Sequence, residues 1–478
     1  MREDASPSTP GLVSGSKHAS STLLMVLLFL ISIIAYADRQ VIALLKPELD
    51  KVFGWSAADY AAISSWSQLS IAVSLLLSGW IVDRLGVKTV LAAGLGGWSL
   101  ATLLHAVVNT VRGFVVVRVA LGVFEGVGTP ATMKAVSTCF PPEARGRVIG
   151  VLNAAPNLAA MLTPVVVSLL FPIAGWRGTV VLIGASGLLC VLAWLLFARI
   201  NPYTSATHTP DTTTDPAPSL PLWRRATGFA LGKFLTDPVW WMLLFWLPDL
   251  LHRRFGLDAA SSGLPLACAY AMAGCGSITG GHGPAILARK AGLQTETARR
   301  LIMLAAACCV LPLPYVLQTG NLALAVFLCG LTLAAHQVFA TNLFGFATEW
   351  VPASRTGRIT GLGAFCGNVG GALMLSLMGH FAAPGGSLLP VFAYGALAYL
   401  AAWVALSALA PSRRLRRRVA RKQFREAGVQ KFPRRAFPAR SALPLPPWPQ
   451  PRPRLPQSPA QVHARPQHRE TPEDGNRL

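Results

Sequence analysis

Apolar residues are gathered along this chain into long segments that are separated by short polar connections. A helix that crosses a membrane needs roughly 20 mainly apolar residues, and segments of about that length recur as far as residue 410. The pattern predicts twelve membrane helices, near residues 22–45, 58–82, 89–109, 112–138, 147–171, 178–199, 226–251, 262–288, 301–317, 321–348, 357–382 and 388–410. We therefore expect an all-α membrane protein.

A polar segment between the sixth and seventh apolar segments divides the chain. Residues 200–225 are rich in Thr, Pro and Asp, which is typical of a flexible cytoplasmic linker. The linker separates an N-terminal six-helix bundle, residues 22–199, from a C-terminal six-helix bundle, residues 226–410. Residues 1–21 are predicted to form a cytoplasmic tail, and residues 411–478 a disordered tail rich in Pro and Arg.

The two halves repeat each other in the same order. The segment Phe140–Gly150 aligns with Val351–Gly361 at an offset of 211 residues, and the same offset places Asn157 on Asn368. Repeats in the same order predict two bundles related by an axis along the membrane normal, as in many transporters. A second pairing sets Phe53-Gly54 against Phe255-Gly256.

The N-terminus imitates a secretory signal. The apolar run Leu23–Ile34 is followed by Ala35-Tyr36-Ala37, which resembles a cleavage site. Cleavage is not expected, because the preceding residues are weakly charged and cleavage would destroy the match between the halves.

Composition agrees with lipid as the solvent of this chain. Hydrophobic residues make up 53% and charged residues 13% of the 478 residues, whereas soluble domains carry about 25% charged residues. This excludes a disordered chain, a small disulfide scaffold and an ordinary cytosolic enzyme. The eight cysteines form no CxxC pair and have no histidine cluster beside them, so neither a metal site nor a disulfide framework is predicted.

The net charge of +22 belongs mainly to the tail and the loops. Residues 411–478 hold 17 basic and 4 acidic residues, which favours contact with anionic lipid over binding of nucleic acid. Connections on one side of the predicted helices hold 13 Lys and Arg, against 6 on the other side. The positive-inside rule therefore predicts that both termini are cytoplasmic.

Four ionisable residues inside predicted membrane helices are the strongest candidates for function, because charge at that depth is costly. Asp38 and Arg39 lie in the first helix, and Arg118 and Glu125 share one face of the fourth. A guanidinium matches a carboxylate bidentately, so Arg39 or Arg118 suits an organic-anion substrate. Burial and nearby guanidinium groups shift the proton affinity of a carboxyl group in opposite directions, so Asp38 and Glu125 are candidate proton carriers. A structural ion-pair network is the alternative.

A short turn after the second predicted helix carries a further motif. It reads Gly79-Trp-Ile-Val-Asp83-Arg84-Leu-Gly86-Val-Lys88. Gly79 would allow a close helix approach, Asp83 would meet a helix N-terminus or an Arg, and Gly86 would make the turn. The two basic residues would hold the loop on the cytoplasmic side. We interpret the motif as a conformational gating element.

These motifs resemble those of the major facilitator superfamily. The loop motif and Arg118-x-x-x-Gly122-x-x-Glu125 are similar to its signatures. The segments Tyr36–Gln40 and Lys233–Trp241 resemble the hexuronate transporters among its anion:cation symporters. The resemblance covers about residues 20–410.

The resemblance implies proton-coupled import of a sugar acid, such as a hexuronate or galactonate, across the bacterial inner membrane. It implies that Arg39 holds the substrate carboxylate, that Asp38 and Glu125 exchange protons, and that Arg118 pairs with these acids. It places Tyr36, Gln68, Asn157 and Asn368 in the sugar pocket, and Trp246 and Asn342 are added as candidates for the same pocket. The implied partners are a small organic anion, protons and membrane lipid, with no cofactor, no metal and a monomeric state.

Other functions remain open at this point. The substrate could be an aromatic or dicarboxylic acid, or the chain could export an anion or a drug. A multi-pass membrane enzyme would need a metal or nucleophile constellation, and a sensor would need a folded signalling domain. Neither feature is found in the sequence. Two departures from the resembling group, Ala35 before the Tyr and Pro156 before Asn157, affect the predicted pocket.

Overall fold

Every predicted apolar segment overlaps one or two helices in the computed structural model of the chain, which describes residues 12–200, 222–350 and 353–410. The described part of the chain contains helices and no strand. In order, the elements are α1 Leu12–Phe53, α2 Ala57–Leu85, α3 Val87–Leu104, α4 Val111–Glu125, α5 Gly128–Cys139, α6 Pro142–Phe197, α7 Leu222–Phe255, α8 Gly263–Lys290, α9 Thr295–Val310, the 3-10 helix η1 Leu313–Leu317, α10 Leu322–Trp350, α11 Ala353–Phe381 and α12 Leu389–Leu409.

The predicted tails and linker fall mostly outside the described residues. This holds for the tail 411–478, for most of the linker 200–225 and for the first part of the tail 1–21. Helix α1 begins at Leu12, which is earlier than the predicted first membrane helix.

Nine helical stretches among the described residues are long and apolar enough to cross a membrane. One of them, Arg147–Phe197, has 51 residues and covers the fifth and sixth predicted helices. Its helical geometry breaks at Gly175, where φ is 62°. Helices α7 and α8 cover the seventh and eighth predicted helices but are not among the nine.

Two glycines of the sequence repeat end equivalent helices. Helix α1 ends at Phe53 before Gly54, and α7 ends at Phe255 before Gly256. Their φ angles are 65° and 70°, in the left-handed region that glycine adopts readily. The two halves therefore share this helix ending at positions that the sequence repeat aligns.

Helix α2 is fixed at both ends by local chemistry. Ser56 and Asp59 form a capping box, in which the Ser56 hydroxyl accepts from the Asp59 amide at 3.1 Å and the Asp59 carboxylate accepts from the Ser56 amide at 2.9 Å. At the other end Gly86, with φ of 77°, closes α2 and starts α3.

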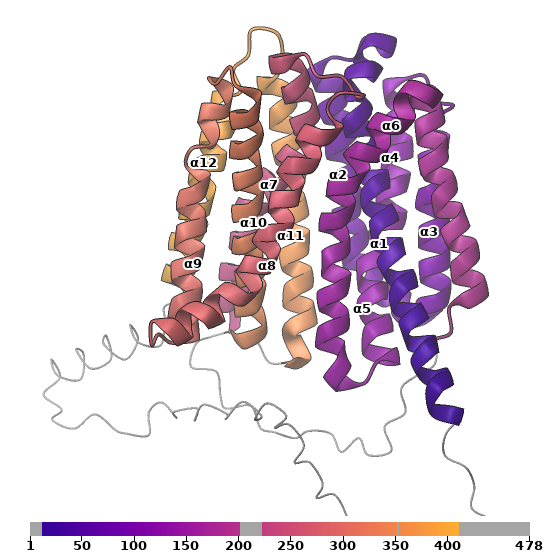
Figure 1. Cartoon of the computed structure of the whole chain (residues 1–478), viewed down its shortest axis with the longest axis vertical. Coiled ribbons are helices and arrows are strands. Elements are labelled where there is room, and N and C mark those ends of the chain that lie inside the picture. Colours follow the sequence, from indigo (N-terminus) through magenta and orange to yellow (C-terminus); the bar gives the residue numbers. More distant parts are fainter. Residues whose placement is uncertain (1–11, 201–221, 351–352, 411–478) are drawn as a thin grey trace, which may run out of the picture. The chain divides into compact units, whose positions relative to one another are not determined.

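The helices of each half lie side by side, and three helix pairs join the halves. Figure 1 shows α1–α6 in indigo to magenta and α7–α12 in pink to yellow. Between the halves, α2 packs along α11, α6 along α8, and α1 along α7. Residues on these six helices can therefore form a site shared by both halves.

Candidate functional site

The four intramembrane charges predicted from the sequence lie together and are almost completely buried. Asp38 and Arg39 lie on α1, Arg118 and Glu125 lie on α4, and none is more than 7% exposed. We call these four residues the central cluster. A spacing of seven residues places Arg118 and Glu125 two turns apart on one face of α4.

Glycines on α4 bring this helix close to α2 and so fix the position of Glu125. A Cβ atom at Gly122 would lie 2.0 Å from Oγ of Ser70, and one at Gly126 would lie 2.4 Å from Cβ of Ser74. Small residues four apart allow two membrane helices to approach closely. Helix α4 ends at Glu125, between the two glycines.

The guanidinium group of Arg39 connects the central cluster to the other half. Its Nη2 atom forms an ion pair with Oε1 of Glu125. Its Cζ atom lies over two aromatic rings, 5.2 Å from the ring centre of Tyr36 and 4.8 Å from that of Trp241 on α7. Nε of Arg39 and Oε2 of Glu125 are buried and have no hydrogen-bond partner among the described residues. Both groups therefore keep polar atoms for a ligand or a proton.

Arg118 supports α1 through its backbone. Its Nη1 atom donates to the carbonyl groups of Asp38 at 3.4 Å and Arg39 at 3.3 Å. Arg118 was expected to pair with the two acids. In the structure the ion pair of Glu125 is formed by Arg39. Both carboxylate oxygens of Asp38 are buried without a hydrogen-bond partner among the described residues. The neighbouring hydroxyl of Thr102 donates to a backbone carbonyl at 3.1 Å.

Two amide pairs cross between the halves. Nε2 of Gln68 on α2 donates to Oδ1 of Asn368 on α11 at 2.6 Å. Nε2 of Gln337 on α10 donates to Oδ1 of Asn157 on α6 at 2.9 Å. The two asparagines that the repeat aligns each bind a glutamine of the other half. Three predicted pocket residues therefore lie at the boundary between the halves.

Two other predicted pocket residues, Trp246 and Asn342, make contacts outside the central cluster and the two amide pairs. Trp246 packs edge-to-face on Tyr60, with 5.2 Å between the ring centres. Asn342 donates to the Gly280 carbonyl on α8 at 3.1 Å. Trp241, and not Trp246, contacts Arg39, because residues five apart point in directions about 140° apart on a helix.

The loop motif lies at the end of α2. Asp83 forms an ion pair with Lys134 of α5, and both side chains are exposed. Arg84 stacks on Trp80 at 4.3 Å, and the Lys88 carbonyl accepts from the Trp194 indole at 3.0 Å. The expected close approach at Gly79 is not seen, since a Cβ atom there would meet nothing within 4 Å.

Sequence reasoning missed a second group of charges, at the ends of α1 and α7. Nζ of Lys46 lies 2.6 Å from Oδ1 of Asp249 and 2.5 Å from Oδ2 of Asp50, and Nε of Arg253 lies 2.7 Å from Oδ2 of Asp249. We call these four residues the α1–α7 cluster. The Tyr60 hydroxyl closes the same region by donating to the Phe245 carbonyl at 2.9 Å.

Two charged residues of α7 are buried. Asp249 lies inside the helix, which continues to Phe255. Lys233 lies 2.6 Å from the Asp237 carboxylate. A Lys or an Asp inside an apolar run was the available signal. The partner of each depends on tertiary structure.

His336 behaves as a packed helix residue. Its Nδ1 atom lies 2.9 Å from the Tyr399 hydroxyl, and its ring stacks on Trp240 with 5.2 Å between ring centres.

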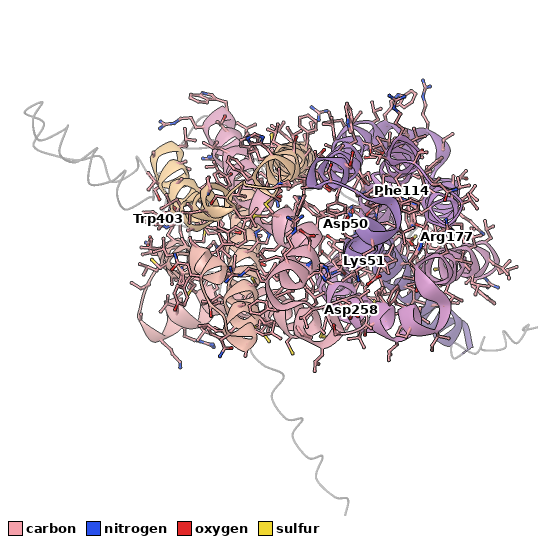
Figure 2. All side chains as sticks on the ribbon, turned by 90° about the horizontal axis from the view of Figure 1, so that it is seen from above. Asp50, Lys51, Phe114, Arg177, Asp258 and Trp403 are labelled. Carbon is pink, nitrogen blue, oxygen red and sulfur yellow. The ribbon has the colours of Figure 1, made fainter. Side chains whose placement is uncertain are left out.

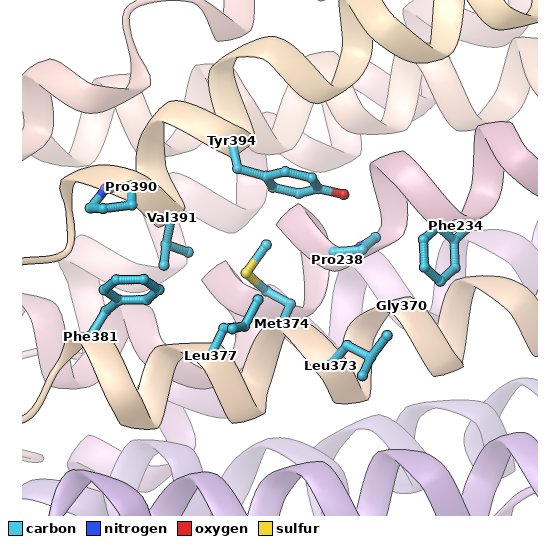
Figure 3. Close-up of a pocket in the computed structure, with 10 residues that line it drawn as sticks. All are labelled: Phe234, Pro238, Gly370, Leu373, Met374, Leu377, Phe381, Pro390, Val391 and Tyr394. Atoms are coloured by element: carbon cyan, nitrogen blue, oxygen red, sulfur yellow. The ribbon is translucent and has the colours of Figure 1, made fainter.

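A separate pocket between α7, α11 and α12 does not suit an anion. Figure 3 shows Phe234, Pro238, Met374, Phe381 and Tyr394 among its lining, and none of the ten lining residues carries a charge. The central cluster is therefore the candidate substrate site. Among the described residues, no three His, Cys, Asp or Glu side chains are grouped so that they could hold a metal ion.

A buried ion-pair site between two groups of membrane helices is typical of secondary transporters. The sequence model described as "Major Facilitator Superfamily" matches residues 28–374. The chain belongs to this superfamily. It is therefore a multi-pass membrane transporter and not an enzyme, as the sequence motifs predict.

Similar proteins of this superfamily include named sugar-acid transporters. The "Probable L-galactonate transporter" of Escherichia coli (strain K12) is 26% identical over 73% of this chain and 81% of its own length. The "Hexuronate transporter" of the same strain is 23% identical over 71% of this chain and 82% of its own length.

A solved structure has the same fold. It is a bacterial homolog of the human lysosomal transporter Spinster, in an inward-facing and occupied conformation. It matches with a TM-score of 0.64 and 17% identity over 81% of this chain and 95% of its own. The likeness supports the predicted all-helical fold of two repeated bundles.

Proposed function

We propose that this chain imports a sugar acid, such as a hexuronate or galactonate, together with protons across the bacterial inner membrane. The names of its relatives support the substrate class. The observation that carries the proposal is the buried pair of Arg39 and Glu125, in which each group keeps an unpartnered polar atom.

The pair of Arg39 and Glu125 couples substrate binding to proton binding, because two carboxylates compete for one guanidinium group. Glu125 and a substrate carboxylate seek the same guanidinium group. When Glu125 binds a proton, it loses the charge that attracts Arg39, and Arg39 then takes the substrate carboxylate in a bidentate pair. Proton binding and substrate binding therefore favour each other. Asp38, which is buried beside Arg39, is the second proton carrier.

Two proton carriers give the transport cycle a driving force. A monoanion that enters with two protons carries one net positive charge inward. The membrane potential favours this movement by about 2.3 kcal/mol per 100 mV.

The α1–α7 cluster closes the outer side in this proposal. The positive-inside rule places the N-terminus in the cytoplasm, so the ends of α1 and α7 face outward. Figure 2 looks onto this end and shows Asp50 and Lys51 near the boundary between the halves. The pair of Lys46 and Asp249 joins the halves and must separate when the outer side opens.

The test is uptake of radiolabelled D-galacturonate into proteoliposomes with an imposed inward proton gradient. We expect accumulation that a proton ionophore abolishes, and none in protein-free liposomes. Unlabelled galactonate, succinate and vanillate are added as competitors. Competition by vanillate or succinate without competition by galactonate would replace the sugar acid with another carboxylate. Uptake that the ionophore leaves unchanged would contradict proton coupling.

A further inference from the structure

The C-terminal half contributes a buried ion pair of its own beside the central cluster. Lys233 and Asp237 lie one turn apart on α7, and their Nζ and Oδ2 atoms are 2.6 Å apart. Both residues are less than 10% exposed. The ammonium group of Lys233 also lies 5.0 Å from the ring centre of Phe344. Burying a charge pair at this depth costs free energy, and ionisable residues inside membrane helices usually serve a function.

The geometry of α7 places Asp237 next to the site of Arg39. Trp241, which carries the Arg39 guanidinium at 4.8 Å, follows Asp237 by four residues. The two side chains therefore share one face, about 6 Å apart along the helix axis. The Tyr36 hydroxyl lies within electrostatic range of Arg39, Glu125 and Asp237.

Helix α11 holds Asp237 and the amide pair at the same level. A Cβ atom at Gly367 would lie 2.1 Å from Oδ2 of Asp237, and one at Gly371 would lie 2.3 Å from the Trp241 ring. These glycines let α7 pack directly on α11. Asn368, which follows Gly367, binds Gln68 across the boundary between the halves. Asp237 thus lies among residues of both halves.

One oxygen of Asp237 is left for a ligand. Oδ2 is held by Lys233, whereas Oδ1 is buried and has no hydrogen-bond partner among the described residues. An acceptor left unpaired in such a place costs free energy, and most buried acceptors have a donor. A carboxylate repels the charged end of an anionic substrate, so the ligand group at Oδ1 is a neutral donor. A sugar hydroxyl is a donor of this kind.

We infer that Asp237 binds the hydroxyl groups of a polyhydroxylated acid whose carboxylate lies on Arg39, and that Lys233 is a positioning residue that orients Asp237. The inference rests on the proposed function and adds how the site distinguishes sugar acids from other carboxylates. The N-terminal half binds the charge of the substrate, and the C-terminal half reads its hydroxyl groups.

The test compares two six-carbon acids, D-galacturonate and hexanoate, which lacks hydroxyl groups. Inhibition constants of both acids against exchange of labelled galacturonate are measured for the wild type and for Asp237→Asn. Losing a hydrogen bond to a charged acceptor weakens binding by about 10- to 100-fold. We expect this loss for galacturonate, with hexanoate changed less than threefold.

Asp249→Asn is the matched control. Asp249 lies on the same helix, is buried, and pairs with a lysine at the same 2.6 Å distance, but it belongs to the α1–α7 cluster. The specificity ratio is the inhibition constant of hexanoate divided by that of galacturonate. Asp249→Asn should keep the wild-type value of this ratio. Lys233→Met should lower the ratio and Lys233→Arg should restore it, as expected for a positioning residue.

Gly367→Ala tests the position of Asp237 without removing a charge. The added Cβ atom would displace the Asp237 carboxylate. This variant should lower the ratio even if Asp237→Asn does not fold. A wild-type ratio in both variants would overturn the inference alone. Loss of proton-driven accumulation with an unchanged ratio in Asp237→Asn would also overturn it, since Asp237 would then carry a proton. Equal inhibition by hexanoate and galacturonate in the wild type would refute both the inference and the sugar-acid proposal.

Discussion

Helix α1 carries two buried cations, Arg39 and Lys46, whose acidic partners lie in different halves of the molecule. Arg39 pairs with Glu125 inside the N-terminal half, and Lys46 pairs with Asp249 of the C-terminal half. The two cations are seven residues apart and so lie on the same face of α1. An ion pair within one half can exchange its partner for a substrate while that half stays rigid. A pair between the halves has to break when the halves move apart.

The two ion pairs should therefore respond differently to substitution. Changes at Arg39 should alter substrate affinity and coupling. Changes at Lys46 should alter stability and the balance between conformations, with little effect on affinity.

The largest effect is expected at Arg39. Arg39→Ala removes the group that binds the substrate carboxylate, and we expect exchange of labelled galacturonate to fall at least 100-fold. Arg39→Lys keeps the charge but loses the bidentate geometry, so it should recover only part of the activity. Counterflow in proteoliposomes measures both. Normal exchange by Arg39→Ala would show that the substrate binds elsewhere.

The next effect is expected at the pair between the halves. Lys46→Met removes the ammonium group that the buried Asp249 carboxylate shares with Asp50, and removal of one partner from a buried pair costs about 3–5 kcal/mol. Thermal unfolding of the purified protein should therefore shift to lower temperature. The double variant Lys46→Met with Asp249→Leu should recover part of the loss. The affinity for substrate should stay within threefold of the wild type, and a larger change would place Lys46 in the substrate site.

A smaller effect is expected at the amide pair of Gln68 and Asn368. Hydrogen bonds between membrane helices contribute about 0.6 kcal/mol on average, so Gln68→Ala should weaken galacturonate binding by less than about tenfold. The double variant with Asn368→Ala should cost little more than either single change. Additive losses would show that each amide binds the substrate independently.

The smallest effect is expected in the connection between α7 and α8. The Ser261 hydroxyl and amide donate to Asp258 and hold the pKa of that carboxyl below its usual value. A lowered pKa stabilises the folded protein above the unfolded pKa of about 3.9, and the contribution disappears as the pH falls through the folded pKa. Asp258→Asn should slightly lower the unfolding temperature at neutral pH. It should leave the pH dependence of uptake unchanged, and a changed profile would place proton coupling outside the central cluster.

The central cluster could be predicted from the sequence, because a charged residue inside an apolar segment is costly and usually serves a function. Asp38, Arg39, Arg118 and Glu125 each interrupt such a segment, and helical spacing places the last two on one face. The repeat also aligned Gly54 with Gly256, and the structure shows that both follow the ends of equivalent helices, with φ angles that glycine adopts readily.

The partners of the charges on α7 could not be predicted. Lys233 pairs along its own helix, whereas Lys46 and Asp249 meet only when two distant helices pack together. The choice between Trp241 and Trp246 depends on how α7 is rotated against α1, which no local pattern specifies. In α6, by contrast, the non-helical residue Gly175 lies between the fifth and sixth predicted membrane helices, as the division of the sequence predicts.

The most direct test of the coupling mechanism is Glu125→Gln in proteoliposomes, with exchange and proton-driven accumulation of galacturonate measured on the same preparation. A glutamine keeps the shape of Glu125 but neither attracts Arg39 as a charge nor carries a proton. We predict exchange at or above the wild-type rate and no accumulation under an inward proton gradient. Accumulation at the wild-type level that remains sensitive to an ionophore would contradict the account.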